Sequence, residues 1–536
     1  MDALTARQTE HEWPALAAIA AVFAAAWWLV LPRANVPVID DWVYAWSVEH
    51  LVETGRLRVL EISAVYPIAQ ILWGALFARI AGFSFVVLRA STMTLSALGC
   101  GAVYLTLREL GCRRSTAFLG ALALAFDPVY FALSFSFMTD VPFVSVSAMA
   151  VYSYVRAIRR RQPAAAWIGC ACATAAFLMR PIGIVLPLAL VPDLVAQRDA
   201  ATRFRRAAPI AAALAVMGAL QLALPRMLGP LDWAAVRQEY LRWWFTVPIA
   251  SYLRWTVEVV FVSVFPLAPL LVAYATAGRR RALEVAAAAI ALAILCRALF
   301  GHLLMPLIDG QTWSLHDIAA RMMFDGAVVS SEWARRIAPL VTAVGLVAVG
   351  ALFIIVARAA RLRAPQGTGW LVIAAVAALH LLCINVLWLY NDRYYVVVAP
   401  LFAIVGASAL DDNPRGRWIA SLLLIVWAAV AVSGTRDMLA VNDAAAAAER
   451  ELEASGIPSW DIDAGYALNG WRLYAHPEHL PAGADRRYTV PFVTSNHPTH
   501  YSITNSPLPG SEVLRVVPLE RATWQSTRVL YVVRRP

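Results

Sequence analysis

The sequence predicts an all-α polytopic membrane protein with about thirteen transmembrane helices and a small mixed α/β domain at its C-terminus. Three observations support this fold class. The chain of 536 residues is 60% hydrophobic and 15% charged, whereas soluble globular proteins carry about 25% charged residues. Its mean hydropathy is +0.63. Apolar stretches long enough to cross a bilayer recur along the chain, with arginine clusters between them.

The apolar stretches begin after a polar N-terminal segment. The first stretch has no convincing cleavage site and is interpreted as a retained span rather than a signal peptide. The predicted spans are 15–32, 86–107, 115–127, 140–157, 164–180, 182–197, 207–225, 253–276, 282–301, 337–357, 369–390, 394–410 and 416–434. The third and fourth spans are short enough to be half-buried elements.

The arginine clusters predict the orientation of the chain. All of them fall on one side of the membrane if the N-terminus is cytoplasmic. The clusters are Arg108, Arg113 and Arg114; Arg159–Arg161; Arg198, Arg203, Arg205 and Arg206; Arg279–Arg281; Arg358, Arg361 and Arg363; and Arg415 and Arg417. The net charge of +10 is thereby explained by topology, and no nucleic-acid partner is predicted.

The opposite, extracytoplasmic side carries the long loops, the first of which spans 33–85. Residues 46–82 are amphipathic and predict a pair of interfacial helices. The tail contains a helical stretch, Ala444–Glu453, and two strand-like runs, Glu512–Pro518 and Arg528–Arg534. The predicted domains are therefore a membrane domain, 1–434, and an extracytoplasmic domain, 435–536. Long loops held by a rigid scaffold commonly carry function, so the active site is expected on this side.

Acidic residues at the outer ends of spans are the first candidates for chemistry, because charge next to the membrane is costly. Asp40 and Asp41 follow the first span, and Asp140 stands where the chain re-enters the membrane. A carboxylate in an apolar setting suits proton abstraction. Helix capping is the alternative for all three, and metal binding is a further alternative for Asp40 and Asp41.

Two arginines depart from the basic-inside pattern. Arg180 and Arg393 both fall on the outer side, and the planar guanidinium is well matched to phosphate. The adjacent Asp392 is an alternative partner for Arg393.

Histidine and cysteine give no metal centre. The pairs His476 and His479, and His497 and His500, have no cysteine or obvious carboxylate to complete a tetrahedral site. For His302 and His316, core or surface roles are favoured, and hydrogen bonding to a substrate is the alternative. None of the six cysteines lies after Gly434, so no disulfide framework is predicted in the tail. The stretch Asp463–Trp471 is distinctive, and turn formation is its expected role.

The order and sidedness of these features resemble the GT-C membrane glycosyltransferases. Within them, the chain is similar to the family that contains protein O-mannosyltransferases and the lipid A aminoarabinose transferase. The features are Asp40 and Asp41 with a downstream Tyr44, the second acidic position Asp140, Arg180 before Pro-Ile-Gly, and Asp392–Arg393–Tyr394 leading into a late span. The resemblance covers about 15–434.

The resemblance implies inverting transfer of a sugar from a polyprenyl-phosphate donor to an envelope lipid, glycan or protein. It implies Asp40 as catalytic base, with Asp41 and Asp140 as further acidic positions. Arg180 and Arg393 would bind the phosphate, and Tyr44, Tyr66 and Tyr394 would line the donor site. The family's Lys-Pro-Pro stretch is replaced here by Val65–Tyr66–Pro67–Ile68, which weakens an assignment to aminoarabinose. Whether the reaction requires a divalent cation is left open.

Other functions fit parts of the same pattern. A transporter or flippase for polyprenyl lipids or small molecules is the main alternative, although no internal repeat is visible. A polysaccharide polymerase or ligase and a non-catalytic scaffold are further alternatives. No Gly-rich nucleotide loop is present. The alanine- and arginine-rich composition suggests a bacterium, and hence the inner membrane.

Overall fold

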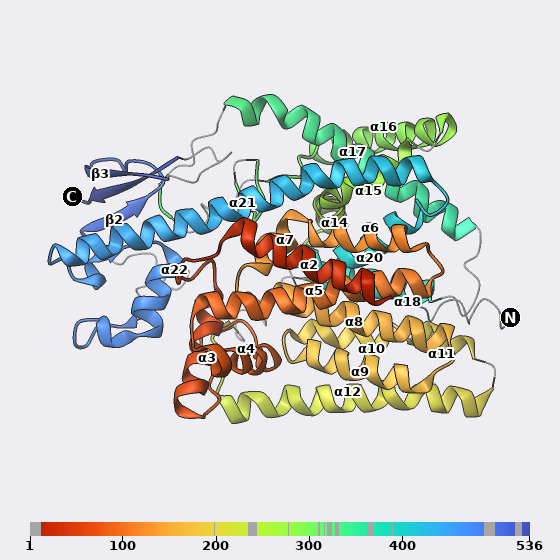
Figure 1. Cartoon of the computed structure of the whole chain (residues 1–536), viewed down its shortest axis with the longest axis horizontal. Helices are drawn as coiled ribbons and strands as arrows, with labels where there is room; N and C mark the ends of the chain where they lie inside the picture. The colour runs from red at the N-terminus through yellow and green to blue at the C-terminus, as the bar shows by residue number, and fades with distance from the viewer. Residues whose placement is uncertain are drawn as a thin grey trace.

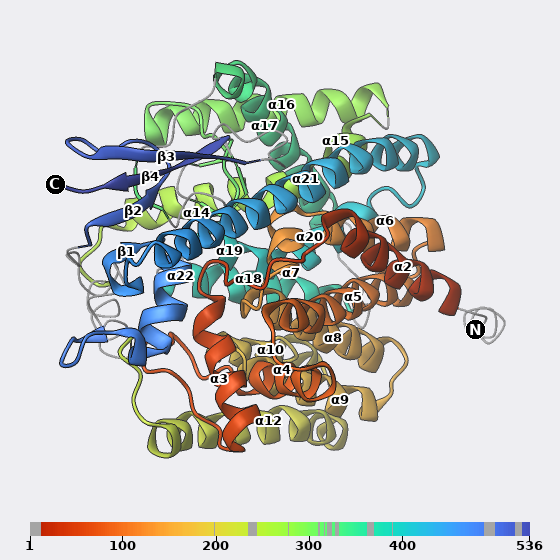
Figure 2. The ribbon, with the colours of Figure 1, turned by 60° about the vertical axis from the view of Figure 1, so that its left-hand side comes forward.

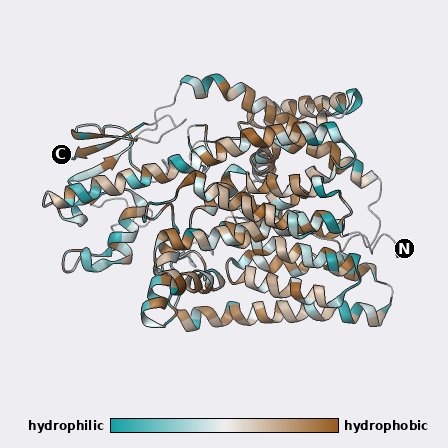
Figure 3. Ribbon diagram, in the orientation of Figure 1, coloured by the Kyte–Doolittle hydropathy of each residue, from teal (hydrophilic) through white to brown (hydrophobic). Residues whose placement is uncertain are grey.

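The structure is a computed structural model in which most of the chain is described (Figure 1). The described residues are 12–536 without 198, 234–243, 277, 309–310, 316, 319–323, 327–331, 362–368, 388–389, 487–498 and 520–527. Apolar residues follow the length of the long helices, and hydrophilic residues gather at the two ends of the bundle (Figure 3).

The first half of the bundle follows the predicted spans closely. Its helices are α2 (Trp13–Val30), α3 (Asp41–Thr54), α4 (Ile68–Ala81), α5 (Phe85–Glu109), α6 (Arg114–Ala125), α7 (Pro128–Ser134), α8 (Asp140–Arg159) and α9 (Pro163–Phe177). At its centre α5 lies directly on α8. A Cβ at Gly99 would stand 2.7 Å from Ser145 Cα, so the close approach of these two helices requires glycine.

The predicted span 182–197 corresponds to one short apolar helical segment, Pro181–Ala196, with irregular turns. Its parts are η1 (Pro181–Ile184), α10 (Val185–Leu188) and α11 (Val191–Ala196). Pro187 and Pro192 account for the irregularity, because proline lacks an amide hydrogen and clashes with the preceding turn.

The second half contains the longest helices. They are α12 (Ala200–Leu228), α14 (Ile249–Val264), η2 (Phe265–Leu267), α15 (Ala268–Ala275), α16 (Arg279–Phe300), α17 (Glu332–Arg361), α18 (Trp370–Val386), α19 (Asp392–Tyr395), η3 (Val396–Val398), α20 (Ala399–Ser408) and α21 (Pro414–Ala454).

Within the described residues, eight helices are long and apolar enough to cross a membrane, or nine if the bent pair α6–α7 counts as one span. The predicted class, a mostly helical multi-pass membrane protein with a small C-terminal sheet, is confirmed. The count of thirteen stays a prediction, since α4, α9, α18 and the η1–α11 segment are apolar but shorter.

The bend between α6 and α7 is 68°. Asp127 causes it locally, because its Oδ1 accepts hydrogen bonds from the backbone amides of Val129 (2.9 Å) and Tyr130 (3.2 Å), and Pro128 opens the new helix. The third predicted span, 115–127, therefore ends in a sharp turn. That turn leads the chain toward the loop before α8.

The helices α3 and α4 form the predicted short pair in the first long loop. They lie at the same end of the bundle as the C-terminal domain, whereas the N-terminus lies at the other end (Figures 1 and 2). Gly55, with φ +70°, ends α3 in the left-handed conformation that glycine adopts without strain.

The C-terminal domain is reached through α21, which continues unbroken from Pro414 to Ala454. The expected boundary at 434/435 and the expected tail helix Ala444–Glu453 thus fall inside one helix. Beyond it lie η4 (Ser459–Asp461), β1 (Ile462–Asp463), α22 (Tyr466–Asn469), the π-helix η5 (Gly470–Ala475), η6 (Pro477–His479), β2 (Tyr501–Thr504), β3 (Glu512–Pro518) and β4 (Val529–Arg534).

The strands form one sheet in the order β1-β2-β4-β3. β1 and β2 are parallel, and the other pairs are antiparallel. Both strand-like runs of the tail, Glu512–Pro518 and Arg528–Arg534, are confirmed as β3 and β4 within one residue.

Candidate active site

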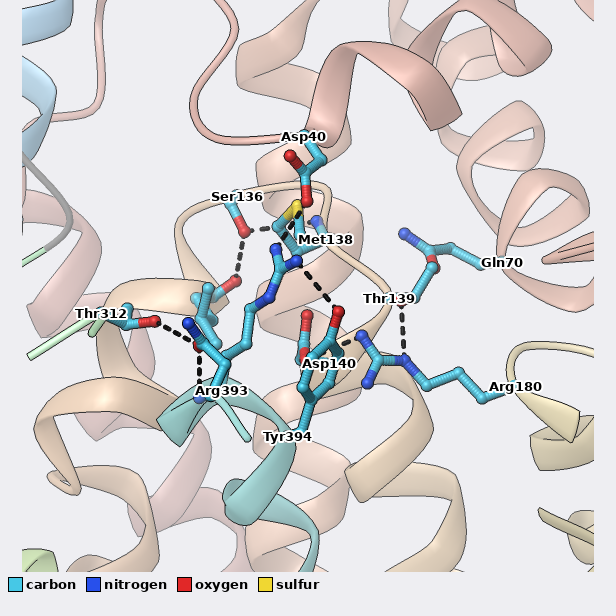
Figure 4. Close-up of polar contacts among 12 residues, drawn as sticks. Asp40, Gln70, Ser136, Met138, Thr139, Asp140, Arg180, Thr312, Arg393 and Tyr394 are labelled. Atoms are coloured by element: carbon cyan, nitrogen blue, oxygen red, sulfur yellow. Dashed lines mark hydrogen bonds and ion pairs between the residues drawn. The ribbon is translucent and has the colours of Figure 1, made fainter. Parts of the chain in front are cut away.

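Four charged residues that are far apart in the sequence meet in one cluster (Figure 4). The cluster adjoins the start of α3, at the end of the bundle that carries the C-terminal domain (Figures 1 and 2). Asp40 precedes α3, Asp140 begins α8, Arg180 precedes η1, and Arg393 lies in α19. Each stands at or beside a helix terminus, which explains how buried helices can bring charged groups together without placing them mid-span. Four of the predicted site residues therefore converge.

The four residues form two ion pairs. Arg393 Nη1 lies 2.6 Å from Asp40 Oδ2, and Arg180 Nη2 lies 2.7 Å from Asp140 Oδ1. The side chain of Asp140 is fully buried, whereas that of Asp40 is 22% exposed. The Asp40 carboxylate is therefore the more accessible of the two acids.

Tyr394 lies between the two arginines. The guanidinium carbons of Arg180 and Arg393 stand 5.1 Å and 5.0 Å from its ring centroid. Its hydroxyl accepts a hydrogen bond of 3.1 Å from Arg393 Nη2. The electron-rich face of the ring stabilises both cations and brings two like charges near one another, so that an anion could contact both.

Hydrogen-bonding capacity remains unused in this cluster. Arg393 Nε is buried and has no hydrogen-bond partner among the described residues. The same holds for both carboxylate oxygens of Asp140, whose ion pair with Arg180 lacks the alignment of a hydrogen bond. Arg180 Nε donates to Thr139 Oγ1 at 2.8 Å. Buried polar atoms without partners are costly, and a ligand with hydroxyls and a phosphate would satisfy these atoms.

Asp41 is separated from Asp40 by the start of α3. Its side chain is fully buried, and its oxygens accept the backbone amides of Val38 (2.8 Å) and Phe137 (3.3 Å). Burial raises the pKa of Asp41 to about 7. The geometry suits a residue that joins the first loop to the loop before α8. That second loop is also held by Gln70, whose Nε2 donates to Phe137 O at 2.7 Å.

The predicted tyrosines are distributed unevenly. Tyr44 lies one turn after Asp40 on α3 and is buried, and burial raises the pKa of its hydroxyl. The charged groups that act on it are Asp40, Arg180 and Arg393, so it belongs to the cluster. Tyr66 makes its hydrogen bond elsewhere, because its hydroxyl donates to Gly229 O at 2.5 Å.

Asp392 does not pair with Arg393, contrary to the alternative that adjacency suggested. Its oxygens accept the backbone amides of Thr312 (2.8 Å) and Trp313 (2.7 Å), and its own amide donates to Gln311 Oε1 at 2.7 Å. Asp392 thus binds the loop after α16. Arg393 is left free to bind Asp40.

Sequence patterns missed a contribution from the C-terminal domain. Tyr466, in α22, interacts with Asp40 and is 8% exposed. The only signal was the unusual composition of Asp463–Trp471, for which turn formation was expected.

The histidines that the sequence singled out have other partners. His476 lies 3.3 Å from both Glu49 and Glu478, and His500 Nδ1 lies 2.7 Å from Asp461 Oδ1. His302 contacts the carbonyl of Leu303. Among the described residues, no three His, Cys, Asp or Glu side chains are grouped so that they could hold a metal ion. His316 and His497 lie outside the described residues.

Comparison with known proteins locates a family similarity inside the membrane domain. Residues 67–227 match the family described as dolichyl-phosphate-mannose-protein mannosyltransferase. The predicted resemblance is confirmed. Asp140 and Arg180 lie in the matched segment, whereas Asp40 and Arg393 lie outside it. No curated protein matches the chain significantly.

Two solved structures are similar over most of the chain. ArnT from Cupriavidus metallidurans, bound to undecaprenyl phosphate, is 14% identical, with coverage of 97% of this chain and 98% of that chain and a TM-score of 0.41. The archaeal oligosaccharyltransferase AglB from Archaeoglobus fulgidus, in complex with an inhibitory peptide and a dolichol-phosphate, is 13% identical. Here coverage is 91% of this chain and 69% of that chain, with a TM-score of 0.45.

Proposed function

We propose that this protein is an inverting glycosyltransferase that moves a sugar from a polyprenyl-phosphate donor to a hydroxyl of an acceptor outside the cytoplasm. The observation that carries the proposal is the convergence of Asp40, Asp140, Arg180 and Arg393 around Tyr394 (Figure 4). The similarity of residues 67–227 to a family of mannosyltransferases that use a polyprenyl-type phosphate supports it.

Arg180 and Arg393 would bind the donor phosphate. Bond cleavage at the anomeric carbon leaves a phosphate monoester that carries more negative charge than the donor, and preorganised cations favour that change. Arg393 Nε is a buried donor without a partner in the described chain. Each guanidinium has five N–H groups, so Arg180 can contact phosphate while it remains paired with Asp140.

Asp40 would act as the general base. The acceptor hydroxyl attacks the anomeric carbon on the face opposite the phosphate, the bond to the phosphate oxygen breaks, and Asp40 takes the hydroxyl proton. The carboxylate is partly exposed and faces the arginines, so an acceptor can reach it. While Arg393 pairs with Asp40 that carboxylate is partly occupied, and donor phosphate would draw Arg393 away and release the base.

Asp140 would orient hydroxyl groups of the sugar or the acceptor. Its two oxygens are buried and accept no hydrogen bond from the described chain. Its charge is balanced by Arg180 at 2.7 Å. Hydroxyl donors would satisfy both oxygens, and a carboxylate accepts them more strongly than a neutral group does. Asp41 would have a positioning role, since both its oxygens are bound to backbone amides.

A groove between α14 and α18 would take the first part of the polyprenyl chain. Its volume is about 400 Å³. It is lined by Trp244, Val247, Ile249, Tyr252, Thr256, Leu381, Leu382, Asn385 and Val386. Asn385 Oδ1 accepts a hydrogen bond of 3.2 Å from Tyr390, three residues before Arg393, so the groove adjoins the segment that would bind phosphate.

The proposed orientation places the site outside the cytoplasm of a bacterial inner membrane and the N-terminus inside. The arginine-rich loops suit the cytoplasmic side by the positive-inside rule. Carriers such as undecaprenyl phosphate, presented at the outer leaflet, would be the donors. The acceptor would be an envelope lipid, a glycan or a protein.

The deciding experiment is transfer from a radiolabelled set of polyprenyl-phosphate sugars to membrane fractions by purified protein. The variant is Asp40→Asn. The matched control is Asp193→Asn, which makes the same change in an ion pair with Arg206 elsewhere in the bundle. We expect wild type and D193N to transfer the label, and folded D40N to transfer none. The donor that is used identifies the sugar.

Two other outcomes would overturn parts of the proposal. Equal transfer by D40N and wild type would exclude Asp40 as base, and Asp140→Asn would then identify the alternative acid. No transfer from any donor would contradict a glycosyltransferase. Movement of labelled lipid across proteoliposomes would then support the alternative of a transporter or flippase.

A further inference from the structure

A short segment of the C-terminal domain lies directly on the helix that follows Asp40. Figures 1 and 2 both place α22 near the start of α3. Trp42 is fully buried there, with its ring centroid 5.9 Å from that of Tyr466 and 5.6 Å from that of Tyr474. A Cβ at Gly470 would stand 2.2 Å from Trp42 Cε2. Only glycine therefore allows this close contact.

The segment is built to present Tyr466 in one orientation. Gly465, with φ +88°, turns the chain immediately before it. Asp463 Oδ1 accepts hydrogen bonds from the Gly465 amide (3.1 Å) and from Asn469 Nδ2 (2.8 Å), and Asn469 Oδ1 accepts the Ala464 amide (2.9 Å). These bonds close a local network around the tyrosine.

The turn is also tied to the rest of the domain and to the loop before α5. Arg535, after β4, donates to Asp463 Oδ2 at 3.1 Å. Trp471 packs against Phe83 and Phe85 with ring centroids 5.9 Å and 5.0 Å apart. The position of Tyr466 is therefore determined by the whole domain rather than by α22 alone.

The hydroxyl of Tyr466 interacts with the Asp40 carboxylate, which also forms the ion pair with Arg393. Burial raises the pKa of Tyr466. The phenol thus stays protonated, and it can only donate to the carboxylate. Asp40 is held by one group from the membrane domain and one from the C-terminal domain.

We propose that Tyr466 is a positioning residue for the catalytic base, so that the C-terminal domain completes the active site. The inference rests on the proposed function. When donor phosphate draws Arg393 away from Asp40, the Tyr466 hydroxyl remains to hold the carboxylate toward the acceptor. A carboxylate fixed in one rotamer removes a proton more effectively than a mobile one, because the reacting atoms are already aligned.

The test compares Tyr466→Phe with Tyr474→Phe in the transfer assay. Both changes delete one hydroxyl from the same face of the domain, but the Tyr474 hydroxyl donates to Glu61 at 3.1 Å. We expect Y466F to lower kcat by about tenfold, the effect of losing one hydrogen bond to a charged group. The KM values for donor and acceptor should not change, and Y474F should keep the wild-type kcat.

A second measurement does not depend on activity. Thermal unfolding of wild type, Y466F, Asp40→Ala and the double variant forms a cycle, and a direct contact predicts that the two changes are not additive. Additive changes would overturn the contact. If wild type transfers sugar and Y466F matches it in kcat, the positioning role is wrong while the proposed function stands. If wild type transfers no sugar but the cycle is non-additive, the proposed function is overturned while the contact is established.

Discussion

Arginine–carboxylate pairs occur at both ends of the helical bundle, and they differ in how far their atoms are satisfied. At the end near the N-terminus, Glu109 binds Arg160 through both oxygens at 2.9 Å. Glu12 accepts from Arg108 at 3.0 Å with one oxygen and from Tyr104 with the other. At the end near the C-terminal domain, neither oxygen of Asp140 accepts a hydrogen bond from the described chain.

An ion pair by itself therefore does not identify a ligand-binding site. A pair whose atoms all have partners can be explained by folding and orientation. A buried pair with unused donors and acceptors is costly to the free protein, and binding a ligand offsets that cost. Arg393 Nε and the Asp140 oxygens therefore point to a substrate, whereas the pairs at the opposite end do not.

The largest effect that tests this comparison is expected from Arg393→Gln. Loss of a cation that stabilises the leaving phosphate should lower kcat/KM by roughly 10²–10³-fold. The control, Arg160→Gln, removes an arginine of a fully bonded pair at the other end and should stay close to wild type. Steady-state transfer with labelled donor measures both. Similar losses in the two variants would remove the distinction between the ends.

A companion measurement concerns the stability of the same variants. Arg393→Gln leaves the partly buried Asp40 without its cation, so its melting temperature should fall. The double variant Asp40→Asn with Arg393→Gln should recover much of that loss, because no unpaired charge remains. It should recover none of the activity. A double variant less stable than R393Q would argue against the pairing.

A smaller effect is expected from Asp140→Asn. If Asp140 orients substrate hydroxyls, the amide should weaken their binding and raise the KM of one substrate by about tenfold, with a smaller change in kcat. The KM values of Asp193→Asn show what the loss of a carboxylate charge elsewhere in the bundle does, so they separate the effect of Asp140 from a general loss of charge. A KM unchanged for both donor and acceptor, with kcat reduced more than in D40N, would make Asp140 the better candidate for the base.

Tyr394 allows the ring and the hydroxyl to be separated. Tyr394→Phe keeps the ring against both arginines and deletes only the oxygen that accepts from Arg393, so transfer should fall by roughly threefold. Tyr394→Leu also removes the cation–π contacts, and transfer should fall by about tenfold. Equal rates for the two variants would show that the ring contributes nothing to the arrangement of the cations.

The smallest effect concerns Asp41 and appears in stability rather than in transfer. The pKa of Asp41 is raised from 3.8 to about 7 by burial in the folded protein, so the folded state binds this proton more tightly than the unfolded state. The resulting stability is complete below pH 3.8 and is lost as the pH rises through 7. The melting temperature should fall across this window. The melting temperature of Asp41→Asn should lack this pH dependence. Parallel curves of melting temperature against pH for wild type and Asp41→Asn would contradict the prediction.

Much of the architecture follows from local sequence properties. Hydropathy over about 20 residues locates spans, and it placed α2, α5 and α8 within a few residues of their observed bounds. The β-branched content of the late runs located β3 and β4. Charge at span ends singled out Asp40, Asp140, Arg180 and Arg393 as candidates, because charged residues are costly there.

What hydropathy missed was the regularity and continuity of helices. The apolar run after Pro181 is helical as predicted, but its prolines make the turns irregular, and it divides into η1, α10 and α11. The polar residues after Gly434 suggested a boundary, yet α21 continues to Ala454. Both differences have one cause: hydropathy reports the solvent that a segment prefers and says little about the path of its backbone.

The sequence by itself determined a multi-pass helical membrane protein, its long loops and the chemical types of the candidate site residues. Only the tertiary structure decided which charges pair. Asp40 and Arg393 are 353 residues apart, Asp392 turns to the loop after α16, Asp41 turns to Phe137, and Tyr466 arrives from the C-terminal domain. The physical reason is range. Hydropathy and turn chemistry act over a few residues, whereas the partner of a buried charge depends on which helix ends the packing brings together.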